Sequence, residues 1–152
     1  MQLVQVDRPG EHLDEVRALL GEYWRSFGFT PCFQGFDEEL AGLPGAYGPP
    51  RGALLLAPGK GCVALRALDA RTAEMKRLYL RPKARGTGLG RALAEAAIAR
   101  ARALGFARLV LDTIPGRMEE AVALYRSMGF RETAPYGETP TPGALCLELP
   151  LR

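Results

Sequence analysis

Apolar residues recur every three or four positions along the first third of the chain, and this spacing predicts helices. Residues 11–27 carry one such apolar stripe and follow a short strand-like segment over residues 2–6. Asp37 is placed to cap a second, shorter helix that runs to Leu43, where a Pro-Gly pair ends it. The first third of the chain is therefore predicted to be one strand followed by two helices.

The middle of the chain has the pattern of short apolar strands that are separated by turns. Residues 52–57, 61–68 and 72–80 are the strand candidates. The connections Pro58-Gly59-Lys60 and Asp69-Ala70-Arg71 have the length and composition of hairpin turns. This part of the chain therefore predicts an antiparallel meander.

Helices and strands alternate in the remainder of the chain. Residues 89–104 predict a helix, and the almost wholly apolar segment 107–113 predicts a buried strand that lies parallel to the strand before the helix. A further helix, introduced by Pro115 and Gly116 and running through Met128, precedes two closing strands over residues 130–133 and 144–149. The predicted order β-α-α-β-β-β-α-β-α-β-β describes one α/β domain over residues 1–152, a mixed, mostly antiparallel twisted sheet flanked by helices.

Composition excludes several classes of protein. With 152 residues, 47% of them hydrophobic, the chain can bury a core without disulfides or metals. A formal net charge of +3 and a pI of about 8.9 are only mildly basic, so we expect no nucleic-acid partner. No apolar run approaches the roughly 18 residues of a membrane span, and the N-terminus lacks a signal-peptide pattern. We therefore expect a cytoplasmic protein without a membrane partner.

The cysteines and the single histidine give little support to metal or disulfide chemistry. Cys32, Cys62 and Cys146 are odd in number and widely spaced among apolar neighbours, which is typical of reduced thiols. His12 stands at the start of a predicted helix, far from any pair of cysteines. We expect neither a disulfide framework nor a metal site.

A glycine-rich stretch stands directly before the helix predicted over residues 89–104. Gly86, Gly88 and Gly90 lack Cβ atoms, so they permit a sharp turn and leave the first N–H groups of the helix uncovered. The helix dipole adds partial positive charge there, and three basic residues flank the stretch, namely Lys83, Arg85 and Arg91. These features predict a site for a phosphate or pyrophosphate group, although a glycine-rich turn that serves packing alone has the same composition.

Three motifs in and around this stretch resemble a known family. The spacing of the glycines excludes a Walker loop and a dinucleotide-binding motif. The run Arg85-Gly86-Thr87-Gly88-Leu89-Gly90 instead resembles the R/Q-x-x-G-x-G/A signature of the GNAT superfamily of N-acetyltransferases. Residues 75–82 resemble the fourth strand of that family, and residues 123–130 resemble its L-Y-x-x-x-G-F signature. One departure is Met118, which stands about where many relatives carry an asparagine.

The resemblance implies the acyl-CoA N-acyltransferase fold and acetyl-CoA as the acetyl donor. Backbone groups of Leu78, Tyr79 and Leu80 would pair with the pantetheine arm, at a point where two parallel strands part. The pyrophosphate would be held by the glycine-rich stretch and its flanking residues, which are Arg85, Gly86, Thr87, Gly88, Leu89, Gly90 and Arg91.

Tyr125 is the candidate acid for acyl transfer. By resemblance, its hydroxyl faces the coenzyme sulfur and protonates the departing thiolate. Its spacing from the apolar residues of the same predicted helix equally fits a core aromatic residue.

Glu74 is the candidate base. It occupies a strand position similar to that of the glutamate that acts as general base in histone-acetylating relatives. Regular alternation would place it on one face of the strand, beside the thioester, together with Lys76, Leu78 and Leu80. A cross-strand ion pair with Arg66 or Lys76, or a water relay in place of Glu74, is the alternative.

The acceptor pocket has only weak candidates in the sequence. Four aromatic residues near the expected variable loops are Trp24, Phe29, Phe33 and Tyr136, and most of them fit a core equally well. The expected reaction is direct transfer, in a ternary complex, from acetyl-CoA to a primary amine of a small molecule, because no cysteine lies in the matched motifs. A peptide or protein N-acetyltransferase and a non-catalytic CoA-binding regulatory module are the alternatives. The resemblance also allows a homodimer formed through the C-terminal strands.

Overall fold

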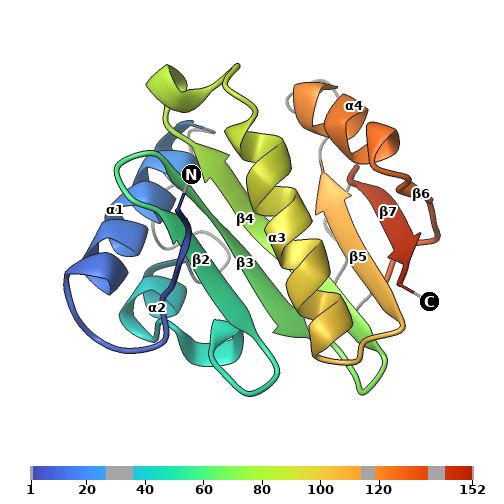
Figure 1. Cartoon of the computed structure of the whole chain (residues 1–152), viewed down its shortest axis with the longest axis horizontal. Helices are drawn as coiled ribbons and strands as arrows, with labels where there is room; N and C mark the ends of the chain where they lie inside the picture. Colours follow the sequence, from blue (N-terminus) through green and yellow to red (C-terminus); the bar gives the residue numbers. More distant parts are fainter. Residues whose placement is uncertain (1, 27–35, 114–118, 137–142, 152) are drawn as a thin grey trace.

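The computed structural model describes residues 2–26, 36–113, 119–136 and 143–151 (Figure 1). The elements follow one another in the predicted order. They are β1 (Val4–Gln5), α1 (Glu11–Ser26), α2 (Phe36–Ala41), a 3₁₀ turn (Gly45–Tyr47), β2 (Ala53–Ala57), β3 (Gly61–Ala67), β4 (Thr72–Leu80), a second 3₁₀ turn (Pro82–Ala84), α3 (Leu89–Ala103), β5 (Arg108–Thr113), α4 (Glu119–Ser127), β6 (Arg131–Glu132) and β7 (Leu145–Pro150).

The strands of the described chain form a single sheet in the order β1-β2-β3-β4-β5-β7-β6. All neighbouring strands are antiparallel except β4 and β5, which run parallel. Tight turns join β2 to β3 and β3 to β4, whereas α3 crosses between the parallel pair, because a parallel connection needs a longer crossover. The predicted α/β fold with a mixed, mostly antiparallel sheet is thus confirmed.

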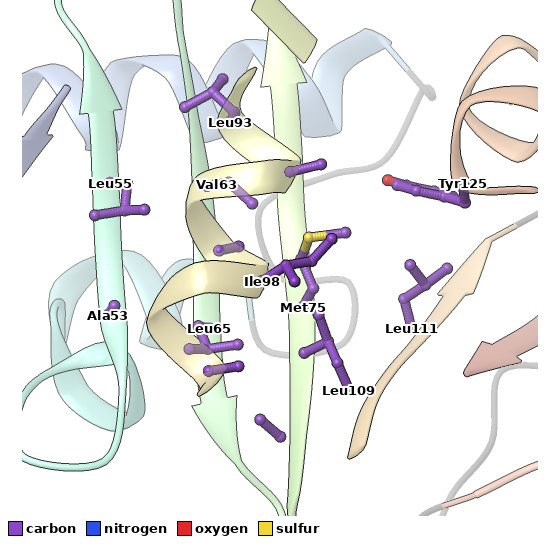
Figure 2. Packing of buried hydrophobic residues seen from close by; sticks show 14 of the residues in the cluster. Ala53, Leu55, Val63, Leu65, Met75, Leu93, Ile98, Leu109, Leu111 and Tyr125 are labelled. Atoms are coloured by element: carbon purple, nitrogen blue, oxygen red, sulfur yellow. The ribbon is translucent and has the colours of Figure 1, made fainter. Parts of the chain in front are cut away.

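Helices cover both faces of the sheet, each over its own hydrophobic core (Figures 1 and 2). Leu93 and Ile98 of α3 and Tyr125 of α4 pack with Leu65 and Leu111 on one face, which we call the α3 face. The opposite face, the α1 face, packs against α1 and α2 through a second apolar cluster that includes Leu13, Leu20, Trp24, Phe36, Leu54 and Leu56. Side chains alternate between these two cores along β2, as the pleat of a strand requires.

The second helix differs from its prediction at both ends. It begins at Phe36 and stops two residues before Leu43, whereas the sequence predicts a cap at Asp37. Asp37 lies inside the first turn, where its Oδ1 accepts a hydrogen bond from the N–H of Glu38 at 2.9 Å. The ring of Phe36 stacks on Trp24 with 3.9 Å between ring centroids, so tertiary packing anchors the first turn of this helix.

Several element ends also move by one or two residues. The first strand spans only Val4–Gln5 and β6 only Arg131–Glu132, because these are the residues that find partners on β2 and β7. Residue 27, the predicted end of the first helix, and residues 114–118, the expected start of α4, lie outside the described residues. None of the described helices is both long and apolar enough to cross a bilayer.

Candidate active site

The sheet opens between β4 and β5. These strands pair at Thr72 with Arg108, at Ala73 with Leu109 and at Glu74 with Val110, and their pairing stops there. The outer edges stay paired beyond this point, since β4 continues along β3 to Leu80 and β5 continues along β7 to Thr113. Figure 1 shows the C-terminal ends of the two strands apart. Within the described part of the chain, the backbone groups of β4 beyond Glu74 that face β5 therefore have no partner on that strand and suit pairing with a ligand.

A β-bulge at Arg77 accompanies the opening. Lys76 pairs with Ala64 and Tyr79 with Cys62, so two residues of β4 stand opposite one residue of β3. Arg77 has a φ of 61°, in the left-handed region that side-chain-bearing residues seldom adopt. A bulge bends its strand and increases the local twist, which fits the divergence of β4 from β5.

The bulge overturns the predicted alternation along this strand. Met75, Leu78 and Leu80 all contact the core of the α3 face, whereas Tyr79 belongs to the core of the α1 face. Glu74, which neighbours Met75 in a regular part of the strand, therefore points to the α1 face. Glu74 therefore lies on the face opposite to that of Leu78 and Leu80. The prediction placed all three on one face because nothing in the sequence pattern indicates the extra residue of the bulge.

A small cavity of about 40 Å³ lies in the opening between β4 and β5. Residues from both faces of the sheet line it, namely Tyr23, Met75, Lys76, Arg77, Leu78, Leu111, Asp112, Thr113 and Tyr125. The cavity thus connects the α3 face with the α1 face through the sheet. A reacting group held here can be reached from two sides.

Tyr125 projects into this region from α4. Its hydroxyl points from α4 toward β4 in Figure 2, and its ring packs against Phe130 with 5.6 Å between centroids. The residue is only 5% exposed, and burial raises the pKa of its hydroxyl well above the ordinary value of 10.0. The phenol is therefore protonated at neutral pH, so it carries a proton that a stronger base could take.

The glycine-rich stretch turns the chain from β4 into α3. Gly86 and Gly88 have φ values of +75° and +83°, which favour glycine, and a Cβ at either position would meet open space. The helix begins at Leu89 without a side-chain cap, and its first helical hydrogen bond runs from Ala92 N–H to Gly88 C=O. Within the described chain, the N–H groups of residues 86–91 donate to no backbone carbonyl.

Gly90 keeps the space beside this helix end open. A Cβ there would lie 3.4 Å from a methyl group of Leu80 and 3.8 Å from one of Leu124, so it would enter the gap between β4 and α4. Leu80 belongs to the part of β4 that β5 does not pair with, so this side of the helix end faces the open part of the sheet. The arrangement fits an elongated ligand with an anionic group at the helix end and a narrow arm along β4.

The model of the acetyltransferase (GNAT) family matches residues 10–130. The chain belongs to the acetyltransferase (GNAT) family. An uncharacterized N-acetyltransferase of Schizosaccharomyces pombe is 39% identical over 145 residues, which cover 91% of this chain and 88% of the relative. An IAA acetyltransferase of Azospirillum brasilense is 39% identical over 94 residues, 60% of each chain.

Solved structures agree with this assignment at the level of the fold. An acetyltransferase from Streptococcus agalactiae superposes with a TM-score of 0.81 at 22% identity, covering 98% of this chain and 97% of the other. A GNAT family acetyltransferase from Elizabethkingia anophelis, crystallised with acetyl-CoA bound, gives a TM-score of 0.68 at 21% identity over 98% and 97% of the chains. This protein is therefore an acetyltransferase of the GNAT fold.

Two basic residues of the acetyltransferase beside the glycine-rich stretch, Arg85 and Arg91, already have contacts within the protein. The Arg85 Nε donates to the Leu80 carbonyl at 3.1 Å. The Arg91 Nη2 donates to Ser127 Oγ at 2.6 Å and thereby bridges α3 and α4. Leu89 is buried in the core, so only its backbone faces a ligand, and Thr87 Oγ1 donates to the Ala84 carbonyl at 2.6 Å.

A larger cavity, of about 790 Å³, lies on the other side of this stretch. Its lining comes from α1, from the turn between β2 and β3 and from the chain after β4, and consists of Glu22, Gly59, Lys60, Arg81, Pro82, Lys83, Ala84, Thr87 and Leu89. Arg81 is the best anchored of its basic residues, because it pairs with Glu22 at 3.0 Å. Lys60 and Lys83 are exposed at its rim.

Glu74 is the candidate whose surroundings differ most from expectation. It is 3% exposed, and both of its oxygens accept hydrogen bonds, Oε1 from Arg66 Nε at 2.7 Å and Oε2 from the Tyr136 hydroxyl at 2.6 Å. Arg66 stands directly opposite Glu74 in the register of β3 and β4. The cross-strand ion pair, one of the alternatives open from sequence, is thus present, and Glu74 does not line the cavity that contains Tyr125.

The four aromatic candidates for the acceptor pocket lie in different surroundings. Trp24 is 3% exposed and belongs to the core of the α1 face, stacked on Phe36, so it is a packing residue rather than a surface for an acceptor. Phe29 and Phe33 lie outside the described residues. Tyr136 stands beside Glu74 on the α1 face, where burial and then the charge of Glu74 raise its pKa.

Sequence reasoning assigned no role in the site to the three charged residues that line the cavity, Lys76, Arg77 and Asp112. Asp112 interrupts the otherwise apolar segment 107–113, and this break was the signal that could have found it. Burial and the charge of Arg77 lower the pKa of Lys76, while Glu74 and Asp112 act in the opposite direction. In the described part of the chain, no group of three or more His, Cys, Asp or Glu side chains is arranged to hold a metal ion.

Proposed function

We propose that this acetyltransferase moves an acetyl group from acetyl-CoA to a primary amine of a small molecule by direct transfer in a ternary complex. The observation that carries the proposal is the run of unpaired N–H groups over residues 86–91, at the mouth of a gap that leads to an opened sheet. The acetyl-CoA bound to the fold neighbour from Elizabethkingia anophelis supports the same donor.

The described residues fit acetyl-CoA as a substrate. N–H groups of residues 86–91 would hold the pyrophosphate, assisted by Arg85 and Arg91, because a helix N-terminus favours a group with negative charge. The free edge of β4 at Leu78, Tyr79 and Leu80 would pair with the amides of the pantetheine arm. The gap beside Gly90 would pass the arm between β4 and α4.

Acyl transfer needs an electrophile, a proton donor and a proton acceptor. Acetyl-CoA supplies the electrophile, an acyl carbon activated as a thioester. Edge N–H groups of β4 can polarise the carbonyl of such a group, and the buried Tyr125 hydroxyl can protonate the departing sulfur. These roles need no covalent bond between the acyl group and the protein.

Direct transfer is supported by the surroundings of two cysteines. A covalent route needs a thiolate. Burial raises the pKa of Cys62 to about 12, and burial likewise raises the pKa of Cys146. Both thiols are therefore protonated at neutral pH and poorly nucleophilic, while Cys32 lies outside the described residues.

The proposal is tested by binding and turnover together. Isothermal titration calorimetry with acetyl-CoA measures the donor site, and the release of free thiol from acetyl-CoA measures transfer across a panel of amino acids, polyamines, aminoglycosides and short peptides. We expect binding together with thiol release for at least one small amine. Release with peptides alone would replace the small-molecule acceptor by a peptide, binding without release would indicate a regulatory module, and absence of binding would overturn the donor assignment.

A further inference from the structure

The cavity between β4 and β5 contains a carboxylate that no sequence motif assigns. Asp112 is the next-to-last residue of β5 and lines the cavity together with Tyr125 and Leu78. Its neighbour Leu111 belongs to the core of the α3 face, so alternation places Asp112 on the α1 face. Tyr125 reaches the cavity from α4, on the other side of the sheet. The carboxylate and the phenol therefore approach one reaction space from opposite faces.

Asp112 and Glu74 differ in what already holds their carboxylates. Both oxygens of Glu74 are engaged, by Arg66 and by Tyr136. A Glu74 that acted as a base would have to give up its contact with Arg66 or with Tyr136. Over the residues that the structure describes, no hydrogen bond or ion pair engages the side chain of the partly buried Asp112. Asp112 can therefore take up a proton without breaking an existing contact.

The other charges around the cavity favour an uncharged amine. Lys76 and Arg77 line it from β4, and only Arg77 is neutralised in a described ion pair, with Glu39 at 2.8 Å. Burial, followed by the charge of Arg77, lowers the pKa of Lys76 in spite of the opposing charges of Glu74 and Asp112, so a positive charge is disfavoured at this position. These surroundings lower the pKa of an ammonium group that approaches from the α1 face and so favour loss of its proton. Asp112 is the carboxylate in the cavity that can receive this proton.

We propose that Asp112 is the catalytic base on the acceptor side of the cavity, and that Glu74 is a positioning residue that holds Arg66 and Tyr136 to the sheet. This inference rests on the proposed acetyl-CoA-dependent transfer. An acceptor that arrives as an ammonium group first loses one proton, which Asp112 passes to solvent. The uncharged amine nitrogen then forms a bond to the acyl carbon, and a second proton passes from this nitrogen to Asp112. The carbon–sulfur bond breaks with its electron pair on sulfur, which takes the proton of Tyr125. Solvent then carries the proton from Asp112 back to Tyr125, and both groups regain their starting states.

An equilibrium experiment tests this assignment without a known acceptor. S-(2-aminoethyl)-CoA carries an ammonium group two bonds beyond the carbon that takes the place of the acyl carbon, and S-propyl-CoA is its uncharged counterpart of similar size. Calorimetry measures both dissociation constants for the wild type, for Asp112→Asn and Asp112→Ser, and for Glu74→Gln. Thermal melts verify that each variant is folded. Two different substitutions are made at position 112 so that the test can still be performed if one of the two variants does not fold.

The two ligands separate the outcomes. We expect both Asp112 variants to weaken binding of the aminoethyl compound about tenfold or more, because a charge-assisted hydrogen bond is lost, and to leave the propyl compound within about twofold. Glu74→Gln should not change the ratio of the two constants. Equal effects on both ligands in the Asp112 variants, or a selective loss in Glu74→Gln alone, would overturn the assignment. If the wild type binds neither of these compounds nor CoA itself, the proposed acetyl-CoA-dependent function is wrong, and the assignment of Asp112 as its base is wrong with it.

Discussion

The two ends of the contact between β4 and β5 have opposite characters. At the paired end, Thr72–Glu74 lies beside Arg108–Val110, and the backbone groups of the two strands satisfy one another. At the open end, the strands part, and the chain places Lys76, Asp112 and the Tyr125 hydroxyl around a cavity instead of apolar side chains in contact. One pair of strands thus serves the stability of the sheet at one end and holds the candidate chemistry at the other.

The difference shows where substitutions should act. Backbone pairing and the two cores hold the paired end, so the open end can carry polar groups without weakening the sheet as a whole. The bulge at Arg77 lies just beyond the paired end, and its side chain is anchored to Glu39 of α2. Substitutions in the open end should therefore change binding or rate, and substitutions at the bulge should change the free energy of unfolding.

Tyr125→Phe is expected to have the largest effect. Loss of the hydroxyl should lower kcat roughly a hundredfold or more, as is typical of a lost proton donor. The dissociation constant for acetyl-CoA should change by less than about threefold, since the ring is retained. Thiol-release kinetics and calorimetry provide the measurements. The control is Tyr47→Phe, a buried tyrosine of the α1 face that does not line the cavity; an equal loss of kcat in that variant would indicate a general packing effect.

Gly90→Leu should block the gap that leads to the open end. Its side chain would enter the space between Leu80 and Leu124, and we expect the dissociation constant of acetyl-CoA to rise on the order of a hundredfold. Gly90→Ala should give a smaller increase, because its Cβ makes only ordinary contacts. Gly21→Ala, in helix α1, is the matched control for a helical glycine, and unchanged binding in Gly90→Leu would refute the path along β4.

Glu39→Gln tests the anchor of the bulge. The carboxylate accepts two hydrogen bonds from Arg77, at 2.9 and 2.8 Å, and the two side chains are 24% and 13% exposed. Removal of the charge should lower the free energy of unfolding by about 2 kcal/mol, roughly thirtyfold in the equilibrium constant. Urea unfolding measures this value. A loss no greater than that of the exposed variant Asp14→Asn would show that the pair contributes little.

The same pair predicts a dependence of stability on acid. Burial tends to raise the pKa of Glu39, but the hydrogen bonds and charge of Arg77 outweigh it, and the pKa in the folded state lies below the ordinary 4.5. The stabilisation is complete above that value and is lost as the pH falls through the lower folded-state pKa. Wild type and Glu39→Gln should therefore approach each other in unfolding free energy between about pH 5 and pH 3. Parallel curves over this range would contradict the assigned shift.

Arg91→Gln is expected to have the smallest effect. Its side chain is exposed and already contacts Ser127, so its contribution to anion binding is screened by solvent and salt. At low salt, we expect the acetyl-CoA dissociation constant to rise roughly two- to threefold. At about 0.5 M salt, the rise should be smaller. The salt series, measured by calorimetry, distinguishes this electrostatic contribution from a loss that is independent of salt.

The paired end and the glycine-rich stretch were predictable because their signals are local. Hairpin turns after residues 57 and 67, the apolar strand 107–113 and the glycines before α3 each determine structure within a few residues. The family motifs led to Tyr125, which does line the cavity. The prediction that acetyl-CoA contacts Arg85–Arg91 stays a prediction, with supporting geometry at the N–H groups.

The open end was not predictable because it depends on contacts between distant segments. The bulge follows from the pairing of β4 with β3 and from the docking of Arg77 on α2, 38 residues away, so alternation alone placed Glu74 on the wrong face relative to Leu78 and Leu80. The hydrogen bond from the Tyr136 hydroxyl to Glu74 likewise joins residues that are 62 positions apart in the sequence. The sequence could not distinguish whether Trp24 lines an acceptor pocket or belongs to the core, because aromatic residues occur in both. Its stacking on Phe36 identifies it as a core residue.

The bulge has a consequence for insertions and deletions in this strand. Lys76 and Arg77 both face α1 and α2, so removal of Arg77 would leave every remaining side chain of β4 on the face that it occupies now. The shortened strand would satisfy the ordinary two-residue repeat and could run on beside β5 as an unbroken ladder. A single missing codon could thus yield a protein that retains its sheet and has sealed the space where two substrates would meet.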